Sequence, residues 1–176
     1  MAPSFAGTLA EAPPELSREA DGLYLSARLP LETPAGLEEV LLRGVPVHFV
    51  WQADLLRARW YWKDQRLVTV QRVVRVAYQP LTRRWRVSVS SGSPMETGLA
   101  GALHQNLDAF EQAMAAVVSV SRWKLADTDM LPDGADLRVD LQLRLDGGLL
   151  SRPFQQGGPG QMDWGEMYRV TLQVPS

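Results

Sequence analysis

The strongest constraint on the fold is a strict alternation of apolar and polar residues in the C-terminal part of the chain. Residues 136–146 read DLRVDLQLRLD, in which every odd-numbered position is apolar and every even-numbered position is polar. Successive side chains of a β-strand point to opposite faces of a sheet, so this pattern predicts a strand with one buried face. A helix would instead need apolar residues three and four positions apart.

The same period of two recurs along the chain, over residues 21–31, 45–55, 66–78, 84–90 and 168–174. Because each of these segments is apolar on one face only, we expect antiparallel pairing rather than a parallel sheet covered on both sides. The pattern predicts about six strands with two short-to-medium helices and no repeating strand–helix–strand unit. The expected fold is mainly β (α+β), an antiparallel β-sandwich-like domain.

Two segments have a helical pattern instead. The first is TPAGLEEVLLRG, residues 33–44, with Thr33 as the expected N-cap. The second is DAFEQAMAAVVSVSRW, residues 108–123, in which Asp108 and Glu111 have the spacing of a capping box. Residues 91–106 and the glycine-rich stretch after residue 150 have the composition of loops.

The apolar positions change parity within LLRARWYWKDQ, residues 55–65. Large apolar residues occupy odd positions up to Leu55, whereas Trp60 and Trp62 lie at even positions. A strand changes its apolar face only where a residue is inserted, so we predict a bulge or break near residues 56–59. With the alternation resumed after that break, Trp60 and Trp62 are predicted to belong to the core.

Positive charge is concentrated in residues 57–86, which hold nine cationic side chains against the single acid Asp64. The segment therefore carries about +8, although the whole chain has a net charge of −2. If the two tryptophans point inward, one cationic face remains, and we take it as the candidate partner-binding surface. It consists of Arg57, Arg59, Tyr61, Lys63, Arg75, Arg84 and Arg86. The alternative is that these arginines only solubilise the sheet and pair with the acids of residues 136–146.

No catalytic or metal-binding motif accompanies this surface. The chain has no cysteine, no nucleophile elbow, no phosphate-binding loop and no His-Glu-x-x-His sequence. Four aspartates offer oxygen ligands for a hard cation but lack the spacing of an EF-hand loop: Asp127, Asp129, Asp133 and Asp136. The two histidines, His48 and His104, lie in different predicted elements. We therefore predict a non-enzymatic protein without a metal or a cofactor.

Two alternative functions stay open. An enzyme with carboxylate chemistry would need acids from residues 127–136 and 163–166 to converge in a pocket. A small-ligand carrier would need a cavity between the sheet layers, lined by residues such as Phe49, Trp51 and Trp85. Nucleic acid is not expected as a partner, because the aromatic side chains among the arginines are predicted to face the core rather than a base.

The N-terminal residues 1–20 are predicted to be a flexible leader, followed by one domain over residues 21–176. Ser4-Phe5-Ala6 places small residues at the two positions that a signal peptidase reads, which suggests the end of a secretory leader. The alternative is an ordinary flexible tail.

Several segments together resemble the proteobacterial family known as domain of unknown function 4390. The most specific are GVPVHFVW (44–51), RWYW (59–62) and YQPLTRRWRV (78–87), and the similarity covers nearly all of residues 21–175. The resemblance implies a secretory leader or apolar anchor and a gene neighbourhood with a nitrogen-regulation-type membrane sensor kinase. It implies no activity, cofactor or catalytic residue.

We accordingly expect a periplasmic or envelope-associated interaction domain. The cationic face would contact a membrane protein such as a sensor kinase, and an anionic membrane surface is the second kind of partner that such a face suits.

Overall fold

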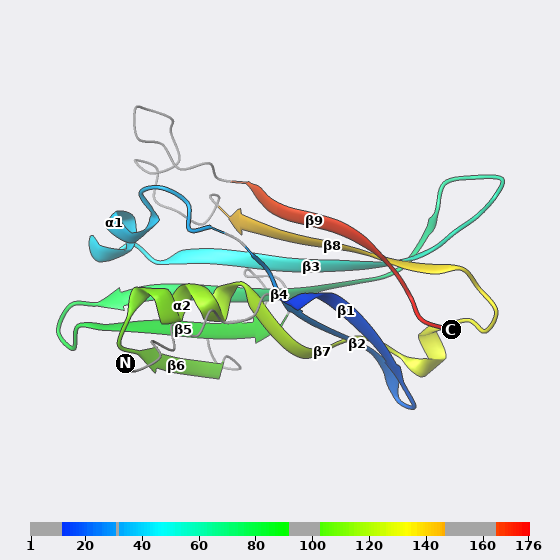
Figure 1. The fold of residues 1–176 in the computed structure, drawn as a ribbon, viewed down its shortest axis with the longest axis horizontal. Coiled ribbons are helices and arrows are strands. Elements are labelled where there is room, and N and C mark those ends of the chain that lie inside the picture. Colours follow the sequence, from blue (N-terminus) through cyan, green and yellow to red (C-terminus); the bar gives the residue numbers. More distant parts are fainter. Residues whose placement is uncertain (1–11, 31, 92–102, 147–164) are drawn as a thin grey trace, which may run out of the picture.

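The computed structural model of the chain describes residues 12–30, 32–91, 103–146 and 165–176, and its architecture is mainly β (Figure 1). Among these residues, nine strands form two antiparallel sheets, accompanied by two short helices. The predicted mainly-β, sandwich-like fold is therefore confirmed, with more strands than the sequence indicated.

The larger sheet contains six strands in the order β6-β5-β4-β3-β8-β9. Its strands are β3 (Val47–Arg57), β4 (Gln65–Gln79), β5 (Arg84–Ser91), β6 (Leu103–Leu107), β8 (Leu137–Asp146) and β9 (Glu166–Gln173). The smaller sheet has the order β1-β2-β7, with β1 (Ala12–Glu19), β2 (Gly22–Arg28) and β7 (Ser119–Asp127). The helices are α1 (Leu37–Leu42) and α2 (Phe110–Val117), and a 3-10 turn, η2, spans Thr128–Met130.

The core lies between the larger sheet on one side and the smaller sheet with α2 on the other (Figure 1). Strand β8 shows the predicted alternation without exception, since its odd-numbered residues are buried and its even-numbered residues are partly exposed. The inward positions predicted for β2 and β3 are also buried, namely Leu23, Leu25, Ala27, Leu29, Val47, Phe49, Trp51, Ala53 and Leu55. The indole Nε1 of Trp51 donates a hydrogen bond of 3.0 Å to the Val117 carbonyl at the end of α2. That bond connects the large sheet to the layer above it.

The predicted break at the end of β3 is confirmed. Leu55 pairs with Val68 but Leu56 pairs with Arg66, so Leu67 has no residue opposite it, and this is a bulge in β4. Strand β3 then ends at Arg57. The turn predicted at residues 79–83 is also present between β4 and β5.

The leader predicted over residues 1–20 is too long, because residues 12–19 form the edge strand β1. The prolines of APPELSRE masked this strand, although an edge strand tolerates proline. Ser4-Phe5-Ala6 lies outside the described residues. In the same way, part of the loop predicted over residues 91–106 is strand β6, which has little buried surface to produce an apolar pattern.

The helix predicted over residues 108–123 ends at Val117, and strand β7 follows. The residues after Val117 include valines, whose branched side chains favour strands. Asp108 is not the cap, since the helix begins after Ala109 without a side-chain cap, and the Asp108 N–H instead donates to the Gln112 side chain at 3.3 Å. Helix α1 likewise begins at Leu37 after Gly36, which has a φ of +83°, rather than after Thr33.

Candidate functional site

The long hairpin of β3 and β4 carries a loop, residues 58–64, that projects from one end of the molecule (Figure 1). We call this loop the hairpin tip. Its base is fixed, because the Ala58 N–H donates a hydrogen bond of 2.9 Å to the Asp136 carbonyl. Beyond Ala58 the tip has no partner strand, since the pairing of β3 with β4 and β8 ends at Arg57.

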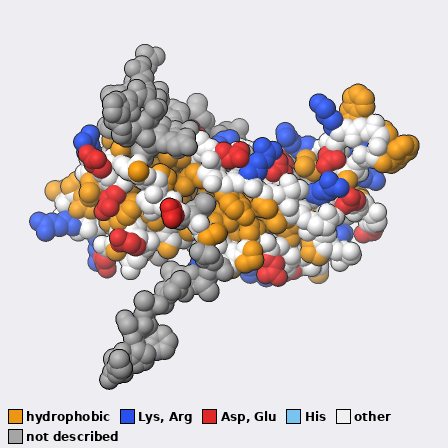
Figure 2. Space-filling model, turned by 45° about the horizontal axis from the view of Figure 1, so that its top comes forward, with side chains coloured by type: hydrophobic (Ala, Val, Ile, Leu, Met, Phe, Trp, Pro, Cys, Tyr) orange, Lys and Arg blue, Asp and Glu red, His pale blue; other side chains and the backbone are white. Residues whose placement is uncertain are grey.

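The hairpin tip carries three exposed aromatic side chains. Trp60 is 95% exposed, Tyr61 is 64% exposed and Trp62 is 72% exposed. The Trp60 and Tyr61 rings meet edge to face with their centroids 5.5 Å apart. Figure 2 shows hydrophobic side chains at the outermost point of this projection, with basic side chains beside them.

The prediction that Trp60 and Trp62 belong to the core is therefore wrong. Alternation decides which side chains are buried only where a strand lies in a sheet, and the ladder ends at Arg57. The parity change marked the end of the strand rather than a shift to the opposite face. Because the inward orientation was also the argument against nucleic acid, that argument does not hold for these two residues.

Basic side chains surround the aromatic ones. Arg57, Arg59 and Lys63 make no ion pair with an acid of the described residues, whereas Arg66 pairs with Asp54 at 3.7 Å. The one acid of the tip, Asp64, lies 4.0 Å from Arg138. The tip and its base thus present uncompensated positive charge next to exposed indole and phenol rings.

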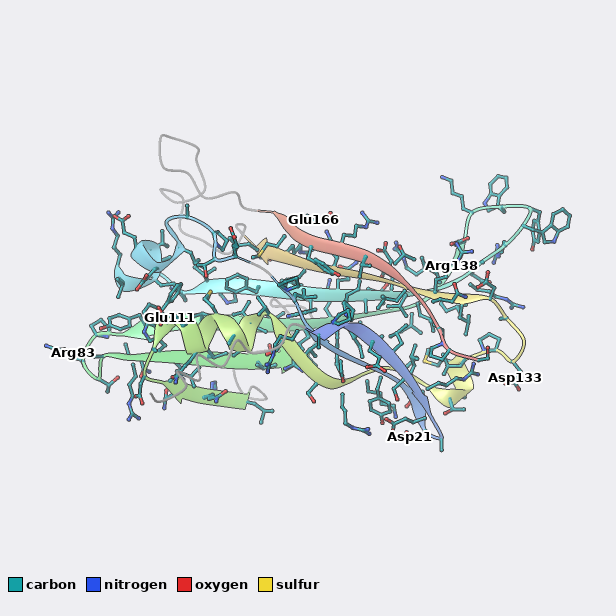
Figure 3. The ribbon with its side chains drawn as sticks, viewed as in Figure 1. Asp21, Arg83, Glu111, Asp133, Arg138 and Glu166 are labelled. Atoms are coloured by element: carbon teal, nitrogen blue, oxygen red, sulfur yellow. The ribbon has the colours of Figure 1, made fainter. Side chains whose placement is uncertain are left out.

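The predicted cationic face does not form one surface. Arg57 pairs with Gln65 at one end of β4, and Arg84 pairs with Gln79 at the other. The 15 residues of β4 span roughly 45 Å. Figure 3 shows Arg83, the neighbour of Arg84, at the end of the molecule opposite the hairpin tip. Four of the seven predicted residues, Arg57, Arg59, Tyr61 and Lys63, are brought together, and the other three lie away from them.

The other three arginines of the predicted face, Arg75, Arg84 and Arg86, lie in local environments that differ from that of the hairpin tip. Arg84 forms an ion pair of 3.2 Å with Asp108, beside α2. Arg75 is half-buried in the middle of the sheet, where burial and then the charge of Arg86 lower the pKa of its guanidinium. Two of the acids of residues 136–146 have other partners, since Asp140 of β8 pairs with Arg169 at 2.7 Å and Asp136, just before β8, pairs with Arg138 at 3.3 Å.

The two histidines lie on the same face of the large sheet but far apart. His48 is opposite Arg75, which is opposite Ser88, which is opposite His104. Three strand spacings, about 14 Å in all, therefore separate the backbone positions of the two histidines. His104 exchanges a hydrogen bond of 2.8 Å with Ser88. Burial lowers the pKa of His48, the charge of Arg75 lowers it further, and Asp146 opposes both.

The acidic residues do not assemble into a site among the described residues. No group of three or more potential metal ligands occurs there. Asp127 pairs with Lys124 at 2.6 Å, and the side chain of Asp133 extends into solvent. Glu166 begins β9 and Asp136 contacts Gln173 at the end of β9, about 20 Å further along the strand (Figure 3). Asp163 lies outside the described residues.

The cavity predicted for a ligand carrier is not where the sequence placed it, because Phe49, Trp51 and Trp85 are packed in the core. A different opening lies between the sheets, with a volume of about 760 Å³. Arg72 lines it, at the position where a charged residue interrupts the apolar pattern of β4. That interruption was the available sequence signal for the groove.

No helix among the described residues has the length and apolar character needed to cross a bilayer. A family model described as domain of unknown function (DUF4390) matches residues 12–166. No curated protein and no solved structure matches the chain.

Proposed function

The chain belongs to the DUF4390 family, whose function is unknown, and we propose that it is a non-enzymatic binding domain of the cell envelope that docks onto an anionic membrane surface through the hairpin tip. The observation that carries the proposal is the exposure of Trp60, Tyr61 and Trp62 on the hairpin tip, which projects from one end of the described part of the molecule (Figure 1).

The aromatic side chains support a membrane interface as the partner. Tryptophan and tyrosine have an apolar ring and one polar atom, and both are enriched at the boundary between lipid headgroups and acyl chains. Because Trp60, Tyr61 and Trp62 are consecutive and all exposed, the apolar area of their rings is in contact with water unless a partner covers it. A bilayer surface accepts the rings without needing a matching pocket.

The charges support an anionic surface. Arg57, Arg59 and Lys63 flank the rings without an ion pair to a described acid. Each basic residue near an anionic membrane contributes about 1 kcal/mol, so the three together contribute about 3 kcal/mol. A single-stranded nucleic acid would need a longer cationic track along its backbone than this tip provides.

The geometry of the hairpin allows docking without any change in the domain. The tip stands clear of the core, and its base is held by the paired strands β3 and β4 and by the hydrogen bond from Ala58 to Asp136. Only residues 58–64 need to enter the interface. Among the described residues, Glu166 lies apart from the acids of residues 127–136, which favours binding over catalysis.

The envelope location rests on Ser4-Phe5-Ala6 and on what the family resemblance implies. In that location a lipid surface is available for docking. A membrane protein such as a sensor kinase is the other partner of the same compartment that the resemblance implies.

Flotation of the protein with vesicles tests the proposal. We expect wild type to float with phosphatidylglycerol vesicles, less with phosphatidylcholine vesicles, and less again as salt is added. The double variant Trp60→Ala/Trp62→Ala and the triple variant Arg57→Glu/Arg59→Glu/Lys63→Glu should each bind at least about tenfold more weakly, which corresponds to about 1.4 kcal/mol.

The matched control is Leu81→Ala/Arg83→Glu, at the turn between β4 and β5, where Leu81 is 100% exposed. This control should bind as wild type does, and all variants should keep the wild-type melting temperature. Vesicle binding that is absent in wild type, or unaffected by both tip variants, would refute the proposal.

A further inference from the structure

The groove between the two sheets has features that the hairpin tip does not use. One wall comes from β1, β2 and β7 and the other from β4, β5 and β6, and the C-terminal turn of α2 lies at one side. Its volume of about 760 Å³ falls in the range of small-molecule sites in proteins.

Arg72 is the central polar feature of this groove. Its position on β4 belongs to the inward-facing set with Val70, Val74 and Val76, so the guanidinium enters from the core side of the sheet. The side chain is half-buried, and its Nε atom is fully buried without a hydrogen-bond partner. Burial lowers the pKa of the Arg72 guanidinium.

No acid of the described residues neutralises this charge. Among the described residues, Glu15 is the one acid that lines the groove, and it forms no ion pair with Arg72 or with Arg28, the second guanidinium there. An unpaired charge away from water is costly, and a guanidinium is suited to a forked contact with a carboxylate or phosphate. The charge of the groove therefore favours an anion.

The rest of the lining combines apolar side chains with polar ones, the latter including Ser26, His104, Gln105, Ser119 and Ser121. Val87 and Val89 of β5 face Ala27 of β2 and Val120 of β7 across the groove. Val87, Ala27 and Val120 are buried, but Val89 is partly exposed, and Leu103 of β6, which pairs with it, is 79% exposed. A small inorganic anion would leave Val89 and Leu103 uncovered, whereas a molecule with an apolar chain would cover them. The groove therefore favours a ligand with an anionic head group and an apolar chain.

We propose that the groove binds a single-chain anionic amphiphile, with its carboxylate or phosphate head on Arg72 and its apolar chain along Val89 and Leu103. This site is independent of the hairpin tip, and either can exist without the other.

Isothermal titration of the full-length chain with dodecanoate, kept below its micelle-forming concentration, tests the site. We expect saturable binding of one molecule per chain. Arg72→Met should weaken it by at least about tenfold, because the apolar volume is kept and the charged contact is lost. Dodecanol, which lacks the charge, should bind wild type about as weakly as dodecanoate binds Arg72→Met.

Arg75→Met is the matched control, since Arg75 is also half-buried on β4 but lies on the opposite face of the sheet. It should bind dodecanoate as wild type does. Arg72→Met should fold with at least wild-type stability in urea, because it removes an unpaired charge. Dodecyl phosphate distinguishes the head groups: tighter binding than dodecanoate points to a phosphate ligand, and weaker binding to a carboxylate.

The proposal is overturned by the absence of saturable binding to wild type. It is equally overturned by wild-type affinity in Arg72→Met, or by equal losses in Arg72→Met and Arg75→Met. A loss of vesicle flotation in the tip variants leaves these results unchanged, so the two sites fail separately.

Discussion

Trp51 and Trp62 have the same side chain and opposite surroundings. Trp51 lies within the paired part of β3 and is 0% exposed, with its Nε1 bonded to Val117, whereas Trp62 lies beyond the last paired residue and is 72% exposed. The sequence alone treats both as apolar residues of one strand. What separates them is the position at which the ladder ends, which depends on how far β4 and β8 extend beside β3.

At the residue scale, the two tryptophans give a matched pair of substitutions. Trp51→Phe removes the hydrogen bond to the buried Val117 carbonyl and part of a packed ring, and it should lower the free energy of unfolding by about 2–3 kcal/mol. Trp62→Phe should change it by less than about 0.5 kcal/mol, as is usual for exposed positions. Urea denaturation measures both. Equal stability of the two variants would contradict the assignment of Trp51 to the core.

At the scale of elements, the small sheet is more irregular than the large sheet, since both of its strand pairings shift register whereas two of the five pairings of the large sheet do. Its pairing of β2 with β7 shifts register twice, and Arg122 of β7 has a φ of +47°. The Arg122 guanidinium bonds to Glu19 of β1 at 2.6 Å and stacks over the Tyr24 ring of β2. One residue on a bulge thus links all three strands of the sheet.

These irregularities explain which strands could be predicted from the sequence. β3 and β8 pair with each other over a long regular stretch, so their alternation was readable. The alternation of β2 was readable because its burial still alternates from Leu23 onward, although its pairing with β7 is irregular. β7 has a bulge that breaks its alternation, β1 contains prolines at an edge, and β6 is an exposed edge with little apolar content. Pattern reading fails where burial is decided by neighbours rather than by the segment itself.

Gly22 tests the close packing of β2 on β7. A Cβ at this position would collide with the backbone carbonyl of Ala126, so Gly22→Ala forces the two strands apart and should cost about 1–3 kcal/mol. Gly165→Ala is the control, because a Cβ there meets nothing within 4 Å. Thermal and urea melts should show a loss of stability for Gly22→Ala and none for Gly165→Ala. Wild-type stability of Gly22→Ala would show that β2 and β7 can move apart at this point without cost.

At the scale of the whole molecule, the length of the β3–β4 hairpin decided how much of the candidate site was predictable. Sequence neighbours at residues 57–63 stay together on the tip, so that part of the predicted surface remained. Arg84 and Arg86 lie near the far end of the sheet because β4 runs almost the full length of the molecule (Figure 1). Parity places side chains on a face but contains no information about distance along it.

The most direct test of membrane docking is photo-cross-linking in cells that express the full-length protein, with a photoreactive residue in place of Tyr61. The same residue in place of Leu81, at the opposite end of the molecule, is the control. We predict lipid adducts from position 61 and none from position 81. A discrete adduct to one membrane protein from position 61, no adduct from position 61, or equal lipid adducts from both positions would each contradict docking of the hairpin tip on the membrane surface.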